Sequence, residues 1–294
     1  MRKVFKWIGL ILGGLVGLIM LTLVVIYFIT QAQLDKTYNV SIKPVAIPTG
    51  PAAIERGRHL VTTIGFCADC HGENLAGQAF DDGPLIGRIS MSNLTSGRGG
   101  VGLSFTGTDW VRAIRHGLDQ DNKSLIDMPA NYYYAFSDAD LGAVIAYLKS
   151  LPPVDNELPE IKIGPMARVF ILQDPSLLPA QVIDHTGPRP AEPEVGVTAA
   201  YGQYLATSCK VCHGEDLSGE PGAGAGQNLT PGGDLANWSE ADFIRTLRTG
   251  VTPQGRKLDP ELMPWNTLGQ LSDDEMKAIW LYLQSLPAIK TESP

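Results

Sequence analysis

The placement of the four cysteines constrains this sequence more than any other feature. All of them fall in two copies of the pattern Cys-x-x-Cys-His, with Cys67, Cys70 and His71 in the first copy and Cys209, Cys212 and His213 in the second. Positions i, i+3 and i+4 of a helix share one face, so two sulfurs and an imidazole can reach one flat ligand together. This spacing is the attachment signature of c-type haem, with the histidine approaching the iron.

Three other chemistries also use paired cysteines. Structural disulfides suit an exported chain, but they do not explain a histidine after each pair. A zinc ribbon places its pairs about 15–20 residues apart, whereas Cys67 and Cys209 lie in different halves of the chain. A thioredoxin-like pair accompanies a βαβ pattern, which neither motif has. The sequence therefore predicts two covalently attached haem c groups, each with one iron.

The sequence also contains an internal repeat. Matching segments follow the two motifs in the same order, at residues 73–77 and 215–219, 93–95 and 228–230, 109–117 and 242–250, 128–129 and 263–264, and 137–152 and 272–287. The first copy carries a short insertion before Asn93. Two copies of about 100 residues predict two similar domains, which we place at residues 51–153 and 196–290.

Each copy has the pattern of a helical domain. Residues 137–140 and 272–275 resemble capping boxes, and apolar residues recur behind them at helical spacing. Residues 239–242 predict the start of another helix, with Thr106 or Thr108 at the matching point of the first copy. No segment shows the alternation typical of strands, so the expected fold class is all-α.

A proline-rich linker is expected between the domains, over residues 154–195. Within it, Ala167 to Leu172 is apolar apart from Arg168. We expect this segment to form a short helix packed between the two domains.

Each iron bound by one histidine needs a second ligand on its opposite face, and methionine in that role raises the reduction potential. The candidates are Met91, Met128, Met166, Met263 and Met276. Only Met128 and Met263 match each other in the repeat, and each precedes a proline, which favours an extended backbone. The sequence predicts the axial pairs His71/Met128 and His213/Met263.

The remaining methionines and histidines have simpler interpretations. Met276 lies in an amphipathic helix and is expected to fill the core, and Met91 has no counterpart in the second copy. His59, His116 and His185 are likewise not shared between the copies. We expect these three histidines to be hydrogen-bonding residues rather than ligands.

The N-terminus carries a membrane signal. Residues 8–30 have no charge and follow a basic head with Arg2, Lys3 and Lys6. A bilayer core takes about 20 such residues, whereas the apolar part of a signal peptide, the alternative, is usually about 7–15 residues long. We therefore expect residues 1–35 to be an uncleaved anchor.

Basic residues remain on the cytoplasmic side, so this anchor places the N-terminus in the cytoplasm and both domains in the periplasm. Residues 36–50 are expected to be a tether. Gly9, Gly13 and Gly17 lie on one helix face, where small residues allow the close approach of a second transmembrane helix.

Composition excludes two further classes of protein. The formal net charge is −8 and 44% of the residues are hydrophobic. Nucleic-acid binding relies on basic patches, and global disorder goes with low hydrophobicity. An acidic body instead favours steering towards a basic partner surface.

In combination, the motifs Cys-x-x-Cys-His-Gly, Asn-Leu-Thr, Met-Pro and the terminal Tyr-Leu-x-Ser-Leu-Pro resemble membrane-anchored dihaem class I cytochromes c of bacterial respiratory chains. This resemblance covers nearly all of residues 50–290. It implies two tandem class I cytochrome c domains, His/Met ligation and electron transfer in the periplasm. Behind the transmembrane helix we therefore expect a relay of single electrons, without independent catalysis.

Two partner classes and one enzyme class remain open at this point. The protein is either a carrier or a fixed subunit of a membrane-bound oxidoreductase or respiratory complex. A dihaem cytochrome c peroxidase is the alternative. Its peroxide-binding iron needs an open position, so a matched Met-Pro in both copies counts against it.

Overall fold

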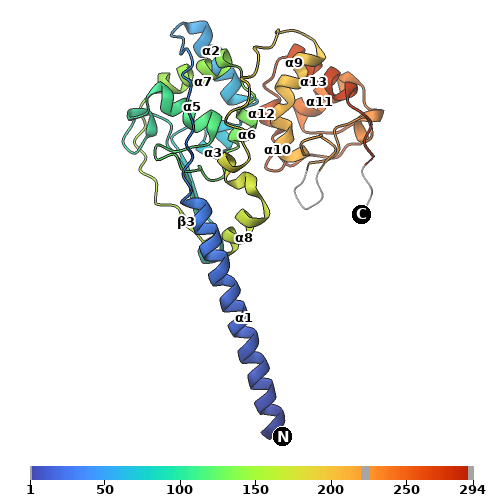
Figure 1. Ribbon diagram of the computed structural model, residues 1–294. Helices are drawn as coiled ribbons and strands as arrows, with labels where there is room; N and C mark the ends of the chain where they lie inside the picture. Colours follow the sequence, from blue (N-terminus) through green and yellow to red (C-terminus); the bar gives the residue numbers. More distant parts are fainter. Residues whose placement is uncertain (1, 220–225, 291–294) are drawn as a thin grey trace.

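The computed structural model describes residues 2–219 and 226–290 (Figure 1). Helix α1 (Arg2–Leu34) projects from a body of two helical domains that lie side by side. Among the described residues, α1 is the one helix that is long and apolar enough to cross a membrane, and its apolar window is fully exposed. It contains the predicted span and extends it at both ends.

The first domain runs from α2 to α7. Its elements are α2 (Pro51–Thr62), α3 (Cys67–His71), β1 (Gln78–Asp81), α4 (Gly83–Ile86), β2 (Gly87–Met91), the 3-10 turn Val101–Leu103, α5 (Gly107–His116), α6 (Ala130–Tyr133) and α7 (Asp138–Ser150). The linker adds β3 (Lys162–Ile163), α8 (Pro165–Gln173) and the 3-10 turns Pro175–Leu177 and Pro179–Gln181.

The second domain repeats this helical plan. Its elements are α9 (Ala199–Leu205), the 3-10 turn Ala206–Cys209, α10 (Lys210–His213), the 3-10 turn Asp234–Asn237, α11 (Glu240–Thr249), α12 (Trp265–Leu268) and α13 (Asp273–Ser285). The backbone follows the repeat closely, since Leu75 and Leu217 both have a positive φ, at 57° and 61°.

The first and last helices of each domain cross at a glycine. A side chain at Gly57 of α2 would overlap the Ala143 carbonyl of α7, and one at Gly202 of α9 would overlap the Ala278 carbonyl of α13. Close approach of two backbones needs a residue without a Cβ. In each domain the first and last helices therefore pack directly against each other.

The predicted helix starts are confirmed. Ser239 and Ser272 open α11 and α13 with complete capping boxes, formed with Asp242 and Glu275. Ser137 caps α7 by accepting from the Asp140 backbone N–H. In the first copy, Thr106 rather than Thr108 is the capping residue of α5.

A small sheet interrupts the otherwise helical fold. β1 and β2 pair antiparallel, with Gln78 opposite Met91, and β2 pairs with β3 through Gly87 and Ile163. The hairpin occupies the insertion that precedes Asn93 in the first copy. Its strands are short and mostly exposed or half-buried, so they carry no long alternating pattern that the sequence could reveal.

The segments expected to be tether and linker both pack on the first domain. Ile42, Val45 and Ile47 contact its core, and the Lys43 carbonyl accepts a 2.6 Å hydrogen bond from Arg189 of the linker. The expected linker helix exists as α8, but its expected position between the domains is wrong. It packs against α1 and α4, at the lower end of the body in Figure 1.

Candidate haem sites

Both motif histidines have the same environment. His71 ends α3 and His213 ends α10, and both side chains are buried. His71 Nδ1 lies 2.7 Å from the Ser92 carbonyl, and His213 Nδ1 lies 2.6 Å from the Gln227 carbonyl. A carbonyl only accepts, so Nδ1 carries the proton and Nε2 keeps the lone pair. Metal-binding histidines are typically held in this way.

The Asn-Leu-Thr motifs explain how those carbonyls are positioned. Asn93 Nδ2 donates to the Val154 carbonyl at 2.8 Å, and Asn228 Nδ2 donates to the Ile289 carbonyl at 2.7 Å. Thr95 and Thr230 close the same loops through hydrogen bonds to the asparagine side chains. Each motif thus latches the loop behind the histidine to the chain that leaves the last helix of its domain.

The first motif opens into an apolar cavity within the first domain. Cys67, Cys70 and His71 line it together with Met128. Apolar side chains form most of the remaining wall: Leu60, Val61, Leu94, Trp110, Ile114, Phe136, Val144 and Leu148. A pocket with paired thiols, an imidazole with a free Nε2 and apolar walls fits a haem.

The second motif lies between two cavities. One is internal to the second domain and is lined by Cys212, His213, Trp238, Leu247 and Met263. None of the four cysteines is paired in a disulfide, so the disulfide alternative has no support. The donor set of the second domain therefore fits a haem as well.

The structure separates the methionines. Met128 and Met263 line the cavities beside the histidines, Met276 is fully buried in the core, and Met166 lies exposed on α8. Met91 also lines the first cavity, which the repeat alone did not indicate.

The position of Met91 follows from its counterpart in the repeat. Met91 directly precedes Ser92, the residue that holds His71, just as Gly226 precedes Gln227. A side chain at Gly226 would overlap the His213 ring. By analogy with Gly226, Met91 is expected on the histidine side of the first cavity, which would leave Met128 for the opposite side.

The second cavity beside the Cys209–His213 motif is shared by the domains. The second domain lines it with Cys209, Met263 and Pro264, and the first domain lines it with Cys70, Pro129 and Tyr133. Cys70 and Tyr133 also line the first cavity. The two sites therefore approach each other across the interface rather than facing opposite directions.

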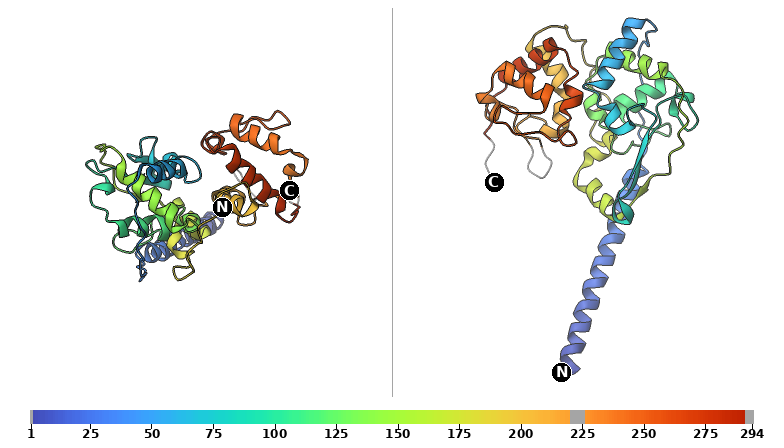
Figure 2. Two further views of the ribbon diagram at one scale, coloured as in Figure 1. Left: turned by 90° about the horizontal axis from the view of Figure 1, so that it is seen from above. Right: turned by 180° about the vertical axis from the view of Figure 1, so that it is seen from behind.

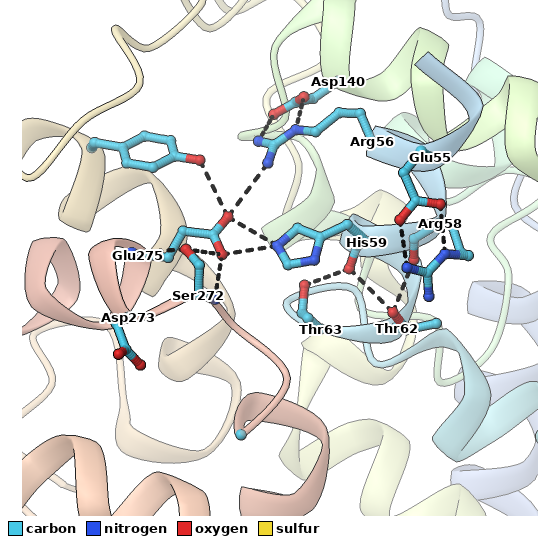
Figure 3. A network of polar contacts seen from close by, with 12 residues as sticks. Glu55, Arg56, Arg58, His59, Thr62, Thr63, Asp140, Ser272, Asp273 and Glu275 are labelled. Carbon is cyan, nitrogen blue, oxygen red and sulfur yellow. Dashed lines mark hydrogen bonds and ion pairs between the residues drawn. The ribbon is translucent and has the colours of Figure 1, made fainter. Parts of the chain in front are cut away.

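A polar network that sequence reasoning missed joins the domains at this interface (Figure 3). We call it the interdomain clasp. It comprises Arg56, His59, Asp140 and Glu275, which Figure 3 labels, and Tyr204, which it does not label. His59 Nε2 lies 2.9 Å from both oxygens of Glu275. Arg56 makes two 2.9 Å hydrogen bonds to Asp140 and one of 3.5 Å to Glu275. Tyr204 Oη donates to Asp140 at 2.7 Å.

The contacts within the clasp shift the pKa values of Glu275 and Tyr204. Burial alone would raise the pKa of Glu275, but hydrogen bonds from His59 and from the Ser272 backbone lower it to about 2. Burial, followed by the nearby Asp140 carboxylate, raises the pKa of Tyr204 above its usual range. Asp140 and Glu275 stand at matching positions in the first turns of α7 and α13, so the sequence showed them only as helix starts.

The fold, the apolar cavity beside each Cys-x-x-Cys-His motif and the side chains that line these cavities define a protein of tandem cytochrome c domains. Two family matches agree: residues 52–148 match "Cytochrome C oxidase, cbb3-type, subunit III", and residues 199–287 match "Cytochrome c". The chain therefore contains two cytochrome c domains, carries two covalently attached haem c groups and functions in electron transport.

Several curated proteins are similar along most of the chain. The fructose dehydrogenase cytochrome subunit of Gluconobacter japonicus is 29% identical over 87% of this chain and 57% of its own length. The gluconate 2-dehydrogenase cytochrome c subunit of Pantoea cypripedii is 30% identical over 81% of this chain and 60% of its own length. A diheme cytochrome c-type protein of Cereibacter sphaeroides is 27% identical over 77% of this chain and 83% of its own length. This chain thus spans little more than half of the two dehydrogenase subunits.

Proposed function

We propose that this protein relays single electrons between its two domains as the cytochrome subunit of a membrane-bound dehydrogenase. The observation that carries the proposal is the shared cavity, whose wall runs from Cys70 and Tyr133 of the first domain to Cys209 and Met263 of the second. Two relatives are themselves cytochrome subunits of dehydrogenases. None of the relatives named above is a peroxidase, so that alternative gains no support.

We assign the haem attachments to Cys67/Cys70 and Cys209/Cys212, and the axial pairs to His71/Met128 and His213/Met263. When bound, haem iron supplies reversible one-electron chemistry, with a potential set by its axial ligands and by burial. The protein's part is positioning. The carbonyls of Ser92 and Gln227 orient the imidazoles, and the apolar walls exclude water.

We further propose that α1 anchors the protein with its N-terminus in the cytoplasm and both domains in the periplasm. The basic residues Arg2, Lys3 and Lys6 precede the apolar stretch, and such residues remain on the cytoplasmic side. The side chains of α1 are exposed over its apolar window, as lipid contact requires.

The relay can be tested by removing one attachment site. The double variant Cys209→Ala/Cys212→Ala should lose one haem mass from the intact denatured chain. After reduction by a single flash-generated electron, the wild type should show redistribution between two spectrally distinct sites, and the variant should not. The complementary variant Cys67→Ala/Cys70→Ala serves as the matched control. A wild type in which the electron never redistributes contradicts the relay.

The partner helix is a separate proposal. A Cβ added at Gly9, Gly13 or Gly17 would meet no atom within 4 Å beyond the backbone of the helix itself, and small residues at this spacing support close helix packing. Replacing all three with leucine should release the copurifying dehydrogenase in mild detergent while both haems remain reducible. Conservative changes on the opposite face (Ile11→Leu, Leu15→Ile, Ile19→Leu) should not. If the glycine variant still copurified with the dehydrogenase, docking would rest on the haem domains instead of on α1.

A further inference from the structure

Exposed apolar side chains gather at the end of the body from which α1 emerges. We call this group the apolar pad, and it comprises Pro84, Leu85, Ile161, Met166 and Phe170. Leu85 is 64% exposed, and the other large members are 43–44% exposed. The pad comes from α4 at the hairpin tip, from the residue before β3 and from α8, all of which flank the last turns of α1 in Figures 1 and 2.

The elements that carry the pad are fixed to one another. The Gly164 N–H donates to the Ile86 carbonyl at 2.8 Å, and a side chain at Gly164 would overlap the Leu85 carbonyl. This contact joins the hairpin tip to the start of α8. Met166 and Phe170 then lie one turn apart on the exposed face of α8, while Ile171 is buried behind them. The pad is a built surface rather than a set of loose side chains.

Contacts between α8 and α1 fix the position of the pad along the axis of α1. Arg168 lies over the Tyr27 ring at 4.3 Å and donates to Thr30 Oγ1 at 2.8 Å and to Gln31 Oε1 at 3.1 Å. Tyr27 to Gln31 is also where the apolar stretch of α1 gives way to polar residues, with Gln31 and Gln33 following Thr30. Tyrosine and arginine typically occupy the boundary between the hydrocarbon and the headgroups. If α1 spans the bilayer, α8 therefore lies where the hydrocarbon core meets the headgroups of its outer leaflet.

From this geometry we infer that the apolar pad inserts into the outer interfacial layer of the lipid bilayer. The inference rests on the proposed anchoring by α1. Continuity with α1 selects lipid as the occupant, because any bilayer that surrounds residues 8–30 meets the pad at its surface. Interfacial binding of this kind scales with the buried apolar area.

The charges around the pad indicate insertion rather than attraction to anionic lipid. Arg88 is paired with Asp81 at 2.7 Å, and Asp82 and Glu160 oppose Lys162 nearby in the chain. With no excess of basic residues, the pad should bind neutral phosphatidylcholine. The body would then be held against the membrane at α1 and at the pad, with a fixed orientation.

Photolabelling of the full chain tests this inference directly. The wild-type holoprotein is placed in phosphatidylcholine nanodiscs whose lipid carries a diazirine on the acyl chain, then irradiated and sequenced by mass spectrometry. Adducts are expected on α1 and on the peptides containing Leu85, Met166 and Phe170. Val195, which is 72% exposed and lies near α2 at the opposite end of the body, should remain unlabelled.

The outcomes separate the two proposals. Labelling of α1 without the pad overturns the inference and leaves the surface free for a protein partner, whereas an unlabelled α1 overturns the anchoring itself. The variant Leu85→Asp/Phe170→Asp should lower pad labelling roughly tenfold, since charge at the interface opposes insertion, and leave labelling of α1 unchanged. Val195→Asp is the control and should change neither. Undiminished pad labelling in the double variant also contradicts insertion.

Discussion

Replacing Met263 with leucine should abolish about half of the weak absorption band that methionine–iron bonds give near the red edge of the visible spectrum. Leucine matches the volume of methionine but has no sulfur lone pair. The affected haem should also fall in potential by on the order of 0.1 V, within the roughly 0.8 V over which axial ligands set haem potentials. Optical spectra of the oxidised protein and a redox titration measure the two effects.

The first domain supplies the matched control for this experiment. Met91 and Met128 line the same cavity, but the analogy with Gly226 places Met91 on the histidine side. Met128→Leu should therefore remove the other half of the band, whereas Met91→Leu should leave the band intact. A band that survives Met128→Leu and disappears in Met91→Leu would reverse the assignment in the first domain.

The second large effect is expected from Glu275→Gln. Glutamine keeps the capping box at the start of α13, because Glu and Gln are both suited to that position. It removes the charge that His59 and Arg56 contact across the interface. Loss of a charged partner from a largely buried network should lower the free energy of unfolding by about 1–3 kcal/mol. Denaturant titration followed separately at the two haem bands would measure this change.

The pH dependence of the clasp has a definite sign. The pKa of Glu275 is depressed to about 2 in the folded protein, against about 4.3 for an unperturbed glutamate. Its stabilising contribution is therefore fully present above the unfolded value and is lost as the pH falls through the folded value. Between about pH 4.5 and 2, wild-type stability should fall more steeply than that of Glu275→Gln.

Glu55 provides the control for both measurements. It lies on α2 beside the clasp residues, but it is exposed and pairs with Arg58 of its own helix. Exposed pairs of this kind contribute little to stability. Glu55→Gln should match the wild type in both assays. If Glu275→Gln also matched it, the clasp would be an incidental contact of the interface.

The local features were predictable because they are short-range. The Cys-x-x-Cys-His motifs, the capping residues Ser137, Ser239 and Ser272, and the matched Met-Pro pairs lie within a few positions of their partners or recur in the repeat. Each domain repeats the same physics, so agreement between the copies strengthened each assignment. The structure places the predicted cysteines, histidines and methionines along the cavity walls, and the axial pairs among them stay a prediction.

The arrangement of the domains was not predictable for the opposite reason. His59 and Glu275 are separated by 216 positions, and nothing in either local pattern indicates the other. The same holds for α8, whose apolar residues predicted a buried helix but could not say which surface it packs on. Arg168, the one charge in that segment, is the residue that contacts α1. The short hairpin escaped detection because its four or five residues per strand have no regular alternation.

The location of the clasp determines how the two domains can move. Arg56 and His59 belong to α2, which lies at the end of the body remote from α1, and the linker crosses to the second domain at the same end (Figure 1). The linker and the clasp thus connect the two domains along the same edge of the body. Rotation about that edge would separate the two domains first at the end of the body from which α1 emerges.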